Sequence, residues 1–222
     1  MNSSDDQSIL VVCTHPDDEC LGAGGTISSH VNAGFQVDIL CLTSNATRLS
    51  ELRAACQELG VTKIYATERD DFAVTLDLRQ EVVDAILDSR PAIVITHSPE
   101  DYNVTHVVCS ELVDQAVEWA SHATIFDNAH RVDRIYQMEI NSLISRPHVL
   151  VDISDSYDTA LTALKKHKSQ MEKSDGFYVK FYDARTHLRG VQGSCNRAEA
   201  FSIKLPFHAG PFYHENNVKK LI

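Results

Sequence analysis

The chain has 222 residues, of which 43% are hydrophobic and 23% are charged, a composition typical of one soluble globular domain with a single large core. Its 20 Lys and Arg against 31 Asp and Glu give a formal net charge of −11. That charge argues against a nucleic-acid binder or a protein held on anionic membranes, since both need a basic face. The polar, acidic N-terminus does not resemble a signal peptide, and no apolar stretch approaches the roughly 20 residues that span a bilayer. We expect one domain over residues 1–222, with residues 1–7 flexible.

Six cysteines are spread along the chain without a Cys-x-x-Cys pair. Cys13, Cys41 and Cys56 lie among apolar residues, as small core side chains do. A chain of this size has a core large enough to fold without disulfide bonds. We therefore expect free thiols and a cytoplasmic location. The sequence leaves open whether the chain forms a homo-oligomer.

Apolar runs alternate with segments of helical periodicity along the first 120 residues. Continuous apolar runs, as in buried parallel strands, predict four strands, at 9–14, 36–43, 63–66 and 92–96. Apolar residues at helical spacing predict helices after these strands, at about 25–33, 48–59, 76–88 and 107–120. This alternation with short connections predicts a Rossmann-like α/β fold, a mostly parallel sheet with right-handed crossovers and helices on both faces.

The pattern is looser after about residue 130. Residues 135–140 and 149–153 are predicted as further strands, and 158–170 as one helix. From Phe177 onward, aromatic residues, Arg and Gly are mixed without clear periodicity, yet the composition is not that of a disordered chain. We expect this part to form an ordered C-terminal extension over the edge of the sheet.

The most informative motif follows the first predicted strand. Thr14-His15-Pro16-Asp17-Asp18-Glu19 places an imidazole and adjacent carboxylates at the carboxyl end of that strand, where open α/β sheets bind ligands. A second polar loop, from His97 to His106, follows the fourth predicted strand and can lie beside the first. His15, Asp18 and His106 can then converge on one ion. Two nitrogens, one carboxylate and an open position are typical of catalytic zinc.

Asp17 is adjacent to one of these candidate ligands but is expected to point elsewhere. A carboxylate in that position can act as a general base and take a proton from an attacking water. We expect zinc as the metal, although N/O sites discriminate weakly, so that Fe²⁺ or another divalent ion can substitute.

Several separated motifs together resemble the LmbE/PIG-L family of zinc-dependent N-deacetylases. The resemblance covers most of the chain, and its motifs occur in the family's order. They are His15-Pro16-Asp17-Asp18-Glu19, Leu21-Gly22, Gly24-Gly25-Thr26, Leu42-Thr43, Arg48-x-x-Glu51, Ala54-Ala55, Leu59-Gly60, the loop 97–106, Val151-Asp152-Ile153-Ser154, His167-x-Ser169-Gln170, Arg189-Gly190 and Ala198-Glu199-Ala200-Phe201. The resemblance implies a Rossmann-like fold and hydrolysis of an acetamide, usually on an N-acetylglucosamine-type conjugate. It also implies His15, Asp18 and His106 as metal ligands and Asp17 as the base.

Two positions of the second loop depart from the family pattern. Asn103 stands where many members have a His that stabilises the oxyanion, and Thr105 stands where an Asp is common. Asn103 can donate a hydrogen bond to an oxyanion but cannot supply a proton. We therefore predict a catalytic role for Asn103 as a neutral donor, with Asp17, once protonated, supplying the proton to the leaving amine. The alternative is that Asn103 caps the following helix. The missing Asp at 105 is expected to weaken support of a ligand.

Further residues are candidates with open alternatives. Arg48 is predicted to face the pocket as a substrate-binding residue, or else to pair with Glu51 on the surface. Asp71, together with Asp70, is predicted to bind sugar hydroxyls, or else to be a surface acid. His97 could line the pocket or orient a ligand. Glu19 is expected to form hydrogen bonds with amides of its loop. His167 and Gln170 are expected either to pack in the fold or to contact the substrate.

Two classes of function remain. The first is a metal-dependent hydrolase that removes an N-acetyl group from a small amino-sugar conjugate or related metabolite. The second is a non-hydrolytic α/β module that binds a nucleotide or phosphosugar at the same sheet edge. The intact His-Pro-Asp-Asp sequence favours the first, since a binding module would not need a base beside an open metal site.

Overall fold

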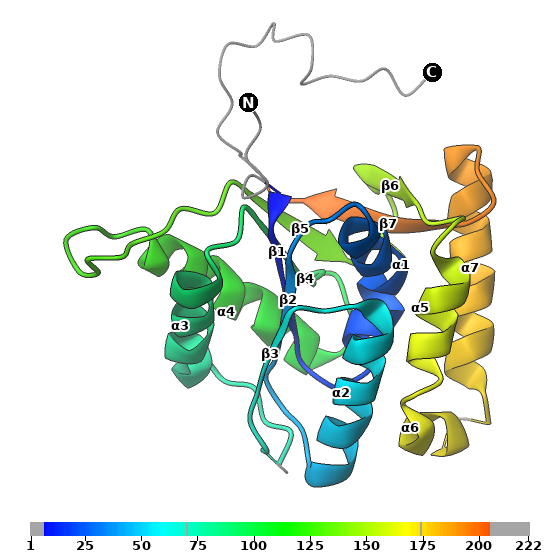
Figure 1. Cartoon of the computed structure of the whole chain (residues 1–222), viewed down its shortest axis with the longest axis horizontal. Coiled ribbons are helices and arrows are strands. Elements are labelled where there is room, and N and C mark those ends of the chain that lie inside the picture. The colour runs from blue at the N-terminus through cyan, green and yellow to red at the C-terminus, as the bar shows by residue number, and fades with distance from the viewer. Residues whose placement is uncertain (1–6, 70, 174, 205–222) are drawn as a thin grey trace, which may run out of the picture.

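One seven-stranded sheet runs through the protein in the computed structural model, which describes residues 7–69, 71–173 and 175–204 (Figure 1). The strand order is β3-β2-β1-β4-β5-β7-β6. The strands are β1 (Ile9–Cys13), β2 (Val37–Cys41), β3 (Lys63–Ala66), β4 (Ile93–His97), β5 (Arg134–Met138), β6 (Val149–Asp152) and β7 (Ala198–Ile203). Strands β1 to β5 are parallel to one another, while β7 pairs antiparallel with both β5 and β6. The predicted mostly parallel sheet is thus confirmed.

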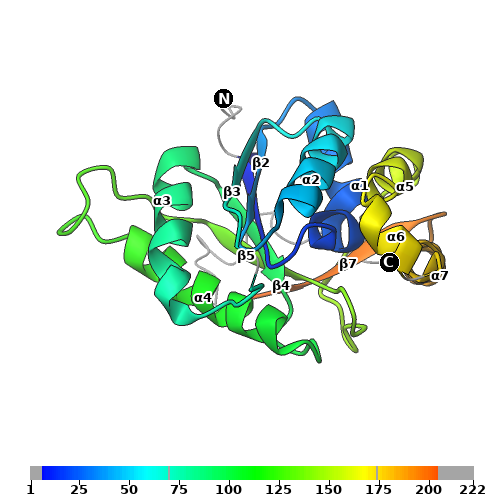
Figure 2. The same cartoon turned by 90° about the horizontal axis from the view of Figure 1, so that it is seen from below.

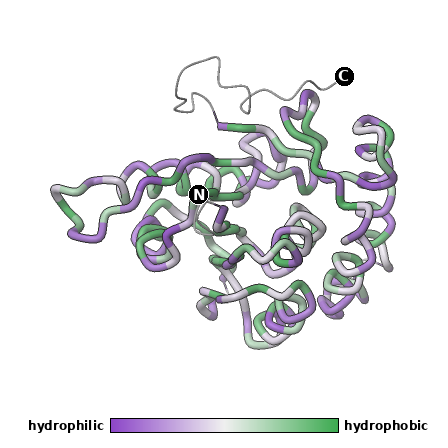
Figure 3. The backbone as a smooth tube through the Cα atoms, turned by 45° about the horizontal axis from the view of Figure 1, so that its top comes forward, coloured by the Kyte–Doolittle hydropathy of each residue, from purple (hydrophilic) through white to green (hydrophobic). Residues whose placement is uncertain are grey.

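Helices cover both faces of this sheet, as predicted. They are α1 (Asp18–Asn32), α2 (Ala46–Leu59), α3 (Arg79–Ser89), α4 (Val104–Ala120), α5 (Tyr157–Leu164), α6 (Lys168–Lys173) and α7 (Phe177–Gly193), and a short 3₁₀-helix, η2 (Leu76–Leu78), precedes α3. Helices α3 and α4 lie on one face, and α1, α2 and α5 lie on the other (Figures 1 and 2). Figure 3 shows hydrophobic strands at the centre and mixed hydropathy along the outer helices.

The burial of strand β1 explains why its sequence is a continuous apolar run. Ile9, Val11 and Cys13 belong to the core cluster under α1, α2 and α5, whereas Leu10 and Val12 belong to the cluster under α3 and α4. Both faces of the strand are buried, so both sets of alternating side chains are apolar.

The same strand sits at the point where the order of the sheet reverses. β1 pairs with β2 on one side and with β4 on the other. The loops that leave the carboxyl ends of β1 and β4 are therefore neighbours, which is where open α/β sheets bind ligands.

Helix α1 begins at Asp18, seven residues before the predicted start at about 25. Gly22, Gly24 and Gly25 lie inside this helix, where its backbone packs closely against strand β5, helix α5 and the residue that follows β6. A Cβ on Gly22 would come within 2.4 Å of Met138 Sδ, and one on Gly25 within 2.7 Å of the Ile153 side chain. Close approach, rather than helix termination, explains this glycine cluster.

Other boundaries also differ from the predictions. The segment predicted as one helix at 158–170 is two helices, α5 and α6, that are interrupted at residues 165–167. Helix α4 begins at Val104 rather than 107, and η2 occupies the first residues of the helix predicted at 76–88.

The largest difference concerns the extension predicted from Phe177 onward, since residues 177–204 form helix α7 and strand β7, while residues 205–222 lie outside the described residues. The buried side of α7 carries Tyr182, Arg185 and Arg189 instead of a purely apolar stripe. Arg189 binds Glu139 through Nε and Nη2, at 3.0 and 2.7 Å, and Arg185 donates to the Ile140 carbonyl at 2.8 Å. Charged residues that are buried with partners remove the periodicity by which a helix is recognised.

All six cysteines lie in the described part of the chain, and all are free thiols. Within residues 7–69, 71–173 and 175–204, no helix combines the length and the hydropathy that crossing a bilayer requires. The flexibility predicted for residues 1–7 falls almost entirely on residues 1–6, which lie outside the described residues.

Candidate metal centre and active site

Two loops form the candidate site, one after β1 and the other after β4. The Thr14 amide donates a hydrogen bond to His97 Nε2 at 3.0 Å, and the Thr14 hydroxyl donates to the Thr105 carbonyl at 3.4 Å. These bonds tie the end of β1 to the end of β4 and to the first turn of α4. The two polar loops that sequence reasoning placed side by side are therefore joined directly.

His15, Asp18 and His106 come together at this junction. His15 Nδ1 lies 3.4 Å from Asp18 Oδ2 and 3.4 Å from His106 Nε2, and His106 Nε2 lies 3.5 Å from Asp18 Oδ1. Three ligands on a tetrahedral ion at zinc bond lengths would be roughly 3.3–3.5 Å apart. Asp18 presents a different oxygen to each histidine, and one ligand atom from each of the three residues can be chosen so that all lie within 4.8 Å of one another. The N₂O donor set and this grouping suit a candidate site for one zinc-sized ion.

His106 is oriented by Asp101. Its Nδ1 lies 3.2 Å from Asp101 Oδ2, which leaves Nε2 free to face His15 and Asp18. Asp101 is in turn fixed by the amides of Asn103 and Asn141, at 2.8 and 3.0 Å. A carboxylate behind a histidine fixes the tautomer and the direction of a metal ligand. Position 105 was expected to leave a ligand with weaker support, but Asp101 places a carboxylate behind His106.

Replacing Asp101 by Asn should weaken metal affinity by about 10–100-fold, because the amide holds His106 less firmly in the ligating tautomer. Competition with a zinc-chelating dye would measure the change. Thr105→Ser keeps a hydroxyl at the neighbouring position and serves as the control. Equal affinities of the Asp101→Asn variant and the wild type would remove Asp101 from this role.

The charge states in the site follow from burial and neighbours. Burial opposes ionisation of Asp18, yet His106, His97 and His15 around it hold its pKa well below the ordinary value. Burial, together with the nearby His106, lowers the pKa of His97 to about 3, so His97 is neutral. Its Nε2 already accepts the Thr14 amide, and its ring stacks on His106 with centroids 4.0 Å apart. His97 therefore packs against the candidate ligand His106, and its Nε2 is used by the Thr14 amide and not by an ion.

Asp17 occupies a strained position at the start of α1. Its backbone has φ 120° and ψ −25°, and its carboxylate does not cap the helix. A residue with a Cβ in such a conformation costs about 1–3 kcal/mol. Burial, and next the negative charge of Asp18, raise the pKa of this carboxyl to about 7, although Arg48 opposes the shift. Such a value suits a group that must accept and return a proton near neutral pH.

Arg48, which donates to the Pro16 carbonyl, lines the same cavity. Its Nη2 lies 3.0 Å from Asp17 Oδ1, and its guanidinium lies over the Phe72 ring. The structure therefore favours the pocket-facing position of Arg48. Glu51, its alternative partner on the surface, instead accepts hydrogen bonds from the amide and hydroxyl of Ser169.

The cavity has a volume of about 190 Å³ and opens to solvent. Its walls are His15, Asp17, Asp18, Leu21, Arg48, Asn103, His106, Ile140, Asn141, Gln170 and Tyr178. Asp71 is not among them, because its carboxylate is exposed and accepts the Ala73 amide at 3.1 Å. Asp70 lies outside the described residues.

Asn103 both caps α4 and faces the cavity. Its Oδ1 accepts hydrogen bonds from the amide and hydroxyl of Thr105, at 3.0 and 2.8 Å. The cap that sequence reasoning held as an alternative is therefore present. Because the cap uses Oδ1, the Nδ2 donor of Asn103 remains for a group in the cavity.

Sequence reasoning assigned no role to Asp101, Asn141 or Tyr178. Asp101 lies in the second loop, five residues before His106, so a carboxylate near a candidate ligand was the available signal. Asn141 and Tyr178 come from the segments after β5 and at the start of α7, and only the fold brings them to the cavity. No spacing in the sequence connects them to the motif at His15.

Fold and site together define an α/β protein with two histidines and one carboxylate grouped as a candidate metal centre at the topological switch point. The comparisons with known proteins agree. A family model described as "PIG-L: GlcNAc-PI de-N-acetylase" matches residues 10–117. The diacetylchitobiose deacetylase of Thermococcus kodakarensis is 29% identical over 194 residues, covering 75% of this chain and 71% of the relative. The chain is thus similar to the LmbE/PIG-L family, and the relative that it matches over most of its length is a deacetylase.

Solved structures share the whole architecture. A conserved protein from Thermus thermophilus has a TM-score of 0.82 and 27% identity, covering 92% of this chain and 97% of that chain. The 4-carboxy-2-hydroxymuconate hydratase of Pseudomonas putida has a TM-score of 0.80 and 21% identity, covering 93% and 99%. A hydratase on this fold means that the fold alone does not fix the reaction, which has to be argued from the site.

Proposed function

We propose that this protein is a metal-dependent amidohydrolase that removes the acetyl group from a small N-acetylated amino-sugar conjugate. One observation carries the proposal: three side chains spaced to hold an ion lie beside the buried carboxylate of Asp17 in an open cavity. The diacetylchitobiose deacetylase among the relatives supports the substrate class.

His15, Asp18 and His106 would hold the ion, which we take to be zinc, with Fe²⁺ as a substitute. When bound, such an ion polarises a carbonyl and makes water more acidic. The donor set supports this assignment, since imidazole nitrogen and carboxylate oxygen are both common zinc ligands.

Asp17 performs the proton transfers. As a carboxylate it accepts a proton while the oxygen of water adds to the acetamide carbon. It then returns the proton to the nitrogen as the C–N bond breaks, giving acetate and a free amine. Arg48, 3.0 Å from Asp17 Oδ1, holds this carboxylate toward the cavity and favours its charged form.

Asn103 can stabilise the transition state. Its Nδ2 donates a hydrogen bond to the oxyanion that develops as the carbonyl carbon becomes tetrahedral. Because Asn is neutral, it cannot protonate the amine, which is a further reason to assign the returned proton to Asp17. The cap on Thr105 fixes the amide, so the donor is oriented before substrate binds.

The proposal can be tested on a panel of N-acetylated sugars. Purified protein loaded with zinc should release free amine and stoichiometric acetate from N,N′-diacetylchitobiose or another N-acetylglucosamine conjugate. Asp17→Asn in the same assay separates the protein's activity from a contaminant. Tight binding of a nucleotide or phosphosugar without turnover of any acetamide would instead support the non-hydrolytic alternative.

Asn103→Ala should lower kcat by about 10²–10³-fold, the usual cost of losing one oxyanion donor. Because the cap is lost as well, the variant should also lose about 1 kcal/mol of stability. Metal content should be unchanged. Asn103→Asp keeps the cap but has no donor, so it should lose turnover without losing stability. If the Ala variant unfolds earlier yet turns over normally at low temperature, Asn103 serves the fold alone.

A further inference from the structure

A fully buried pair of polar side chains lies behind the candidate site. Glu19 Oε1 is 2.7 Å from His167 Nε2, and neither side chain has measurable exposure. The Cys20 thiol also donates to Glu19 Oε1, at 3.2 Å. These groups do not line the cavity, so substrate does not touch them. Burying two ionisable side chains costs desolvation free energy, so the contacts that they make indicate what they hold in place.

The other oxygen of Glu19 reaches the backbone of Asp17. Glu19 Oε2 accepts the Asp17 amide at 2.9 Å, in the manner of a carboxylate that reaches back to the N-cap residue of its helix. Asp17 is the residue whose φ of 120° puts it in the region that favours glycine. A strained residue keeps such a conformation only when its surroundings hold it there.

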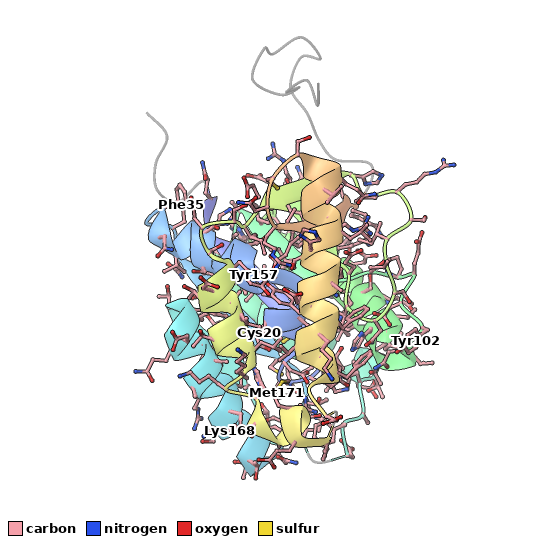
Figure 4. All side chains as sticks on the ribbon, turned by 90° about the vertical axis from the view of Figure 1, so that its right-hand side faces the viewer. Cys20, Phe35, Tyr102, Tyr157, Lys168 and Met171 are labelled. Atoms are coloured by element: carbon pink, nitrogen blue, oxygen red, sulfur yellow. The ribbon has the colours of Figure 1, made fainter. Side chains whose placement is uncertain are left out.

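His167 anchors Glu19 from a distant part of the chain. It lies at the interruption between α5 and α6, where its carbonyl accepts the Gln170 and Met171 amides at the start of α6. Figure 4 shows Cys20, in the first turn of α1, with Met171 of α6 beneath it. The break in the helix predicted at 158–170 thus places the imidazole under the first turn of α1.

We propose that Glu19 and His167 are positioning residues that hold Asp17 in its strained conformation with its carboxylate turned into the cavity. This inference rests on the proposed function of Asp17 as the base. The Glu19 carboxylate bridges two partners, the Asp17 amide and the His167 imidazole. Losing it frees the Asp17 backbone to relax to negative φ, which turns the base away from the substrate.

Three variants test the pair in the zinc-loaded, full-length chain with N,N′-diacetylchitobiose as probe. Glu19→Ala should lower kcat by about 10–100-fold with KM and zinc content unchanged, because a supporting contact is lost. Glu19→Gln should recover most of the rate, since its carbonyl can accept the Asp17 amide while its NH₂ donates to neutral His167. In an Asp17→Asn background, Glu19→Ala should add less than about a threefold loss, because the pair acts through Asp17.

Glu199 offers a matched control. This residue of β7 is also a buried carboxylate that binds α1, and it accepts the Gly25 and Thr26 amides at 2.9 and 2.8 Å, farther along the helix than Asp17. Glu199→Ala should lower the melting temperature while the folded protein keeps its kcat. If Glu19→Ala does not fold, the double variant Glu19→Leu/His167→Leu replaces the pair with apolar groups that a core tolerates, and its kcat should fall by the same factor.

Crystal structures of the variants give a readout that does not depend on activity. Asp17 should leave the positive-φ region in Glu19→Ala, or in the double variant, and keep it in Glu19→Gln and Glu199→Ala. Retention of positive φ without Glu19, or a normal kcat in a folded variant that lacks it, would overturn the inference. A wild-type protein that hydrolyses no acetamide would overturn the proposed function instead. In that case the φ angle of Asp17 in the variant structures would still test whether Glu19 and His167 hold its backbone.

Discussion

Asp17→Asn should lower kcat by about 10²–10⁴-fold, the usual contribution of general base catalysis, and leave the fold and the metal in place. The amide has the same shape but cannot accept a proton from water or return one to the amine. Release of free amine measures the rate, and elemental analysis of the dialysed protein measures the metal. A variant that keeps its metal and turns over at a near-normal rate would show that another group is the base.

The pH dependence of the rate should also differ between Asp17→Asn and the wild type. Asp17 acts as a carboxylate, so the rate should rise as pH increases through its pKa and then level off. In the metal-free protein, burial and Asp18 raise that pKa to about 7. A cation on the neighbouring ligands favours the carboxylate, so the acid limb of kcat/KM is expected at or below pH 7. This limb should be missing from Asp17→Asn, because a neutral amide does not titrate in this range.

Much of the candidate site could be predicted because it depends on sheet topology. Two loops that follow neighbouring parallel strands must lie at one edge, so His15 and His106 could be placed together although they are 91 positions apart in the sequence. The long-range pair of Glu19 and His167 follows no such rule. It depends on the interruption between α5 and α6, which the apolar periodicity of the segment concealed.

The C-terminal part shows a second limit of sequence reasoning. Hydrophobic periodicity detects a helix whose buried side is apolar, but the buried side of α7 carries Arg185 and Arg189 with a partner in Glu139. From the sequence alone, such a helix cannot be distinguished from an exposed polar segment, because the acidic partner of its arginines is distant in the chain. The same helix brings Tyr178 to the cavity, so this part of the cavity wall could not be predicted for the same reason.

Removing the metal should have the largest effect of any change. We expect one zinc per chain, at roughly 2.0–2.2 Å from His15, Asp18 and His106. Dialysis against a chelator should lower the rate by on the order of 10³-fold or more, since an ion in such a site supplies several kcal/mol of transition-state stabilisation. Readdition of zinc should restore the rate. His106→Ala should bind little zinc and stay inactive when zinc is added.

The control for this experiment is His97, a neutral histidine that stacks on His106 but uses its Nε2 to accept the Thr14 amide. His97→Gln can still accept that amide and should keep one zinc per chain, because His97 is not a ligand. Anomalous scattering from zinc-soaked crystals locates the ion directly. An ion bound by Glu19, Cys20 and His167, a second group of suitable atoms among the described residues, would contradict the assignment. So would full activity after the chelator has removed all metal, because Asp17 and Asn103 would then have to provide the catalysis alone.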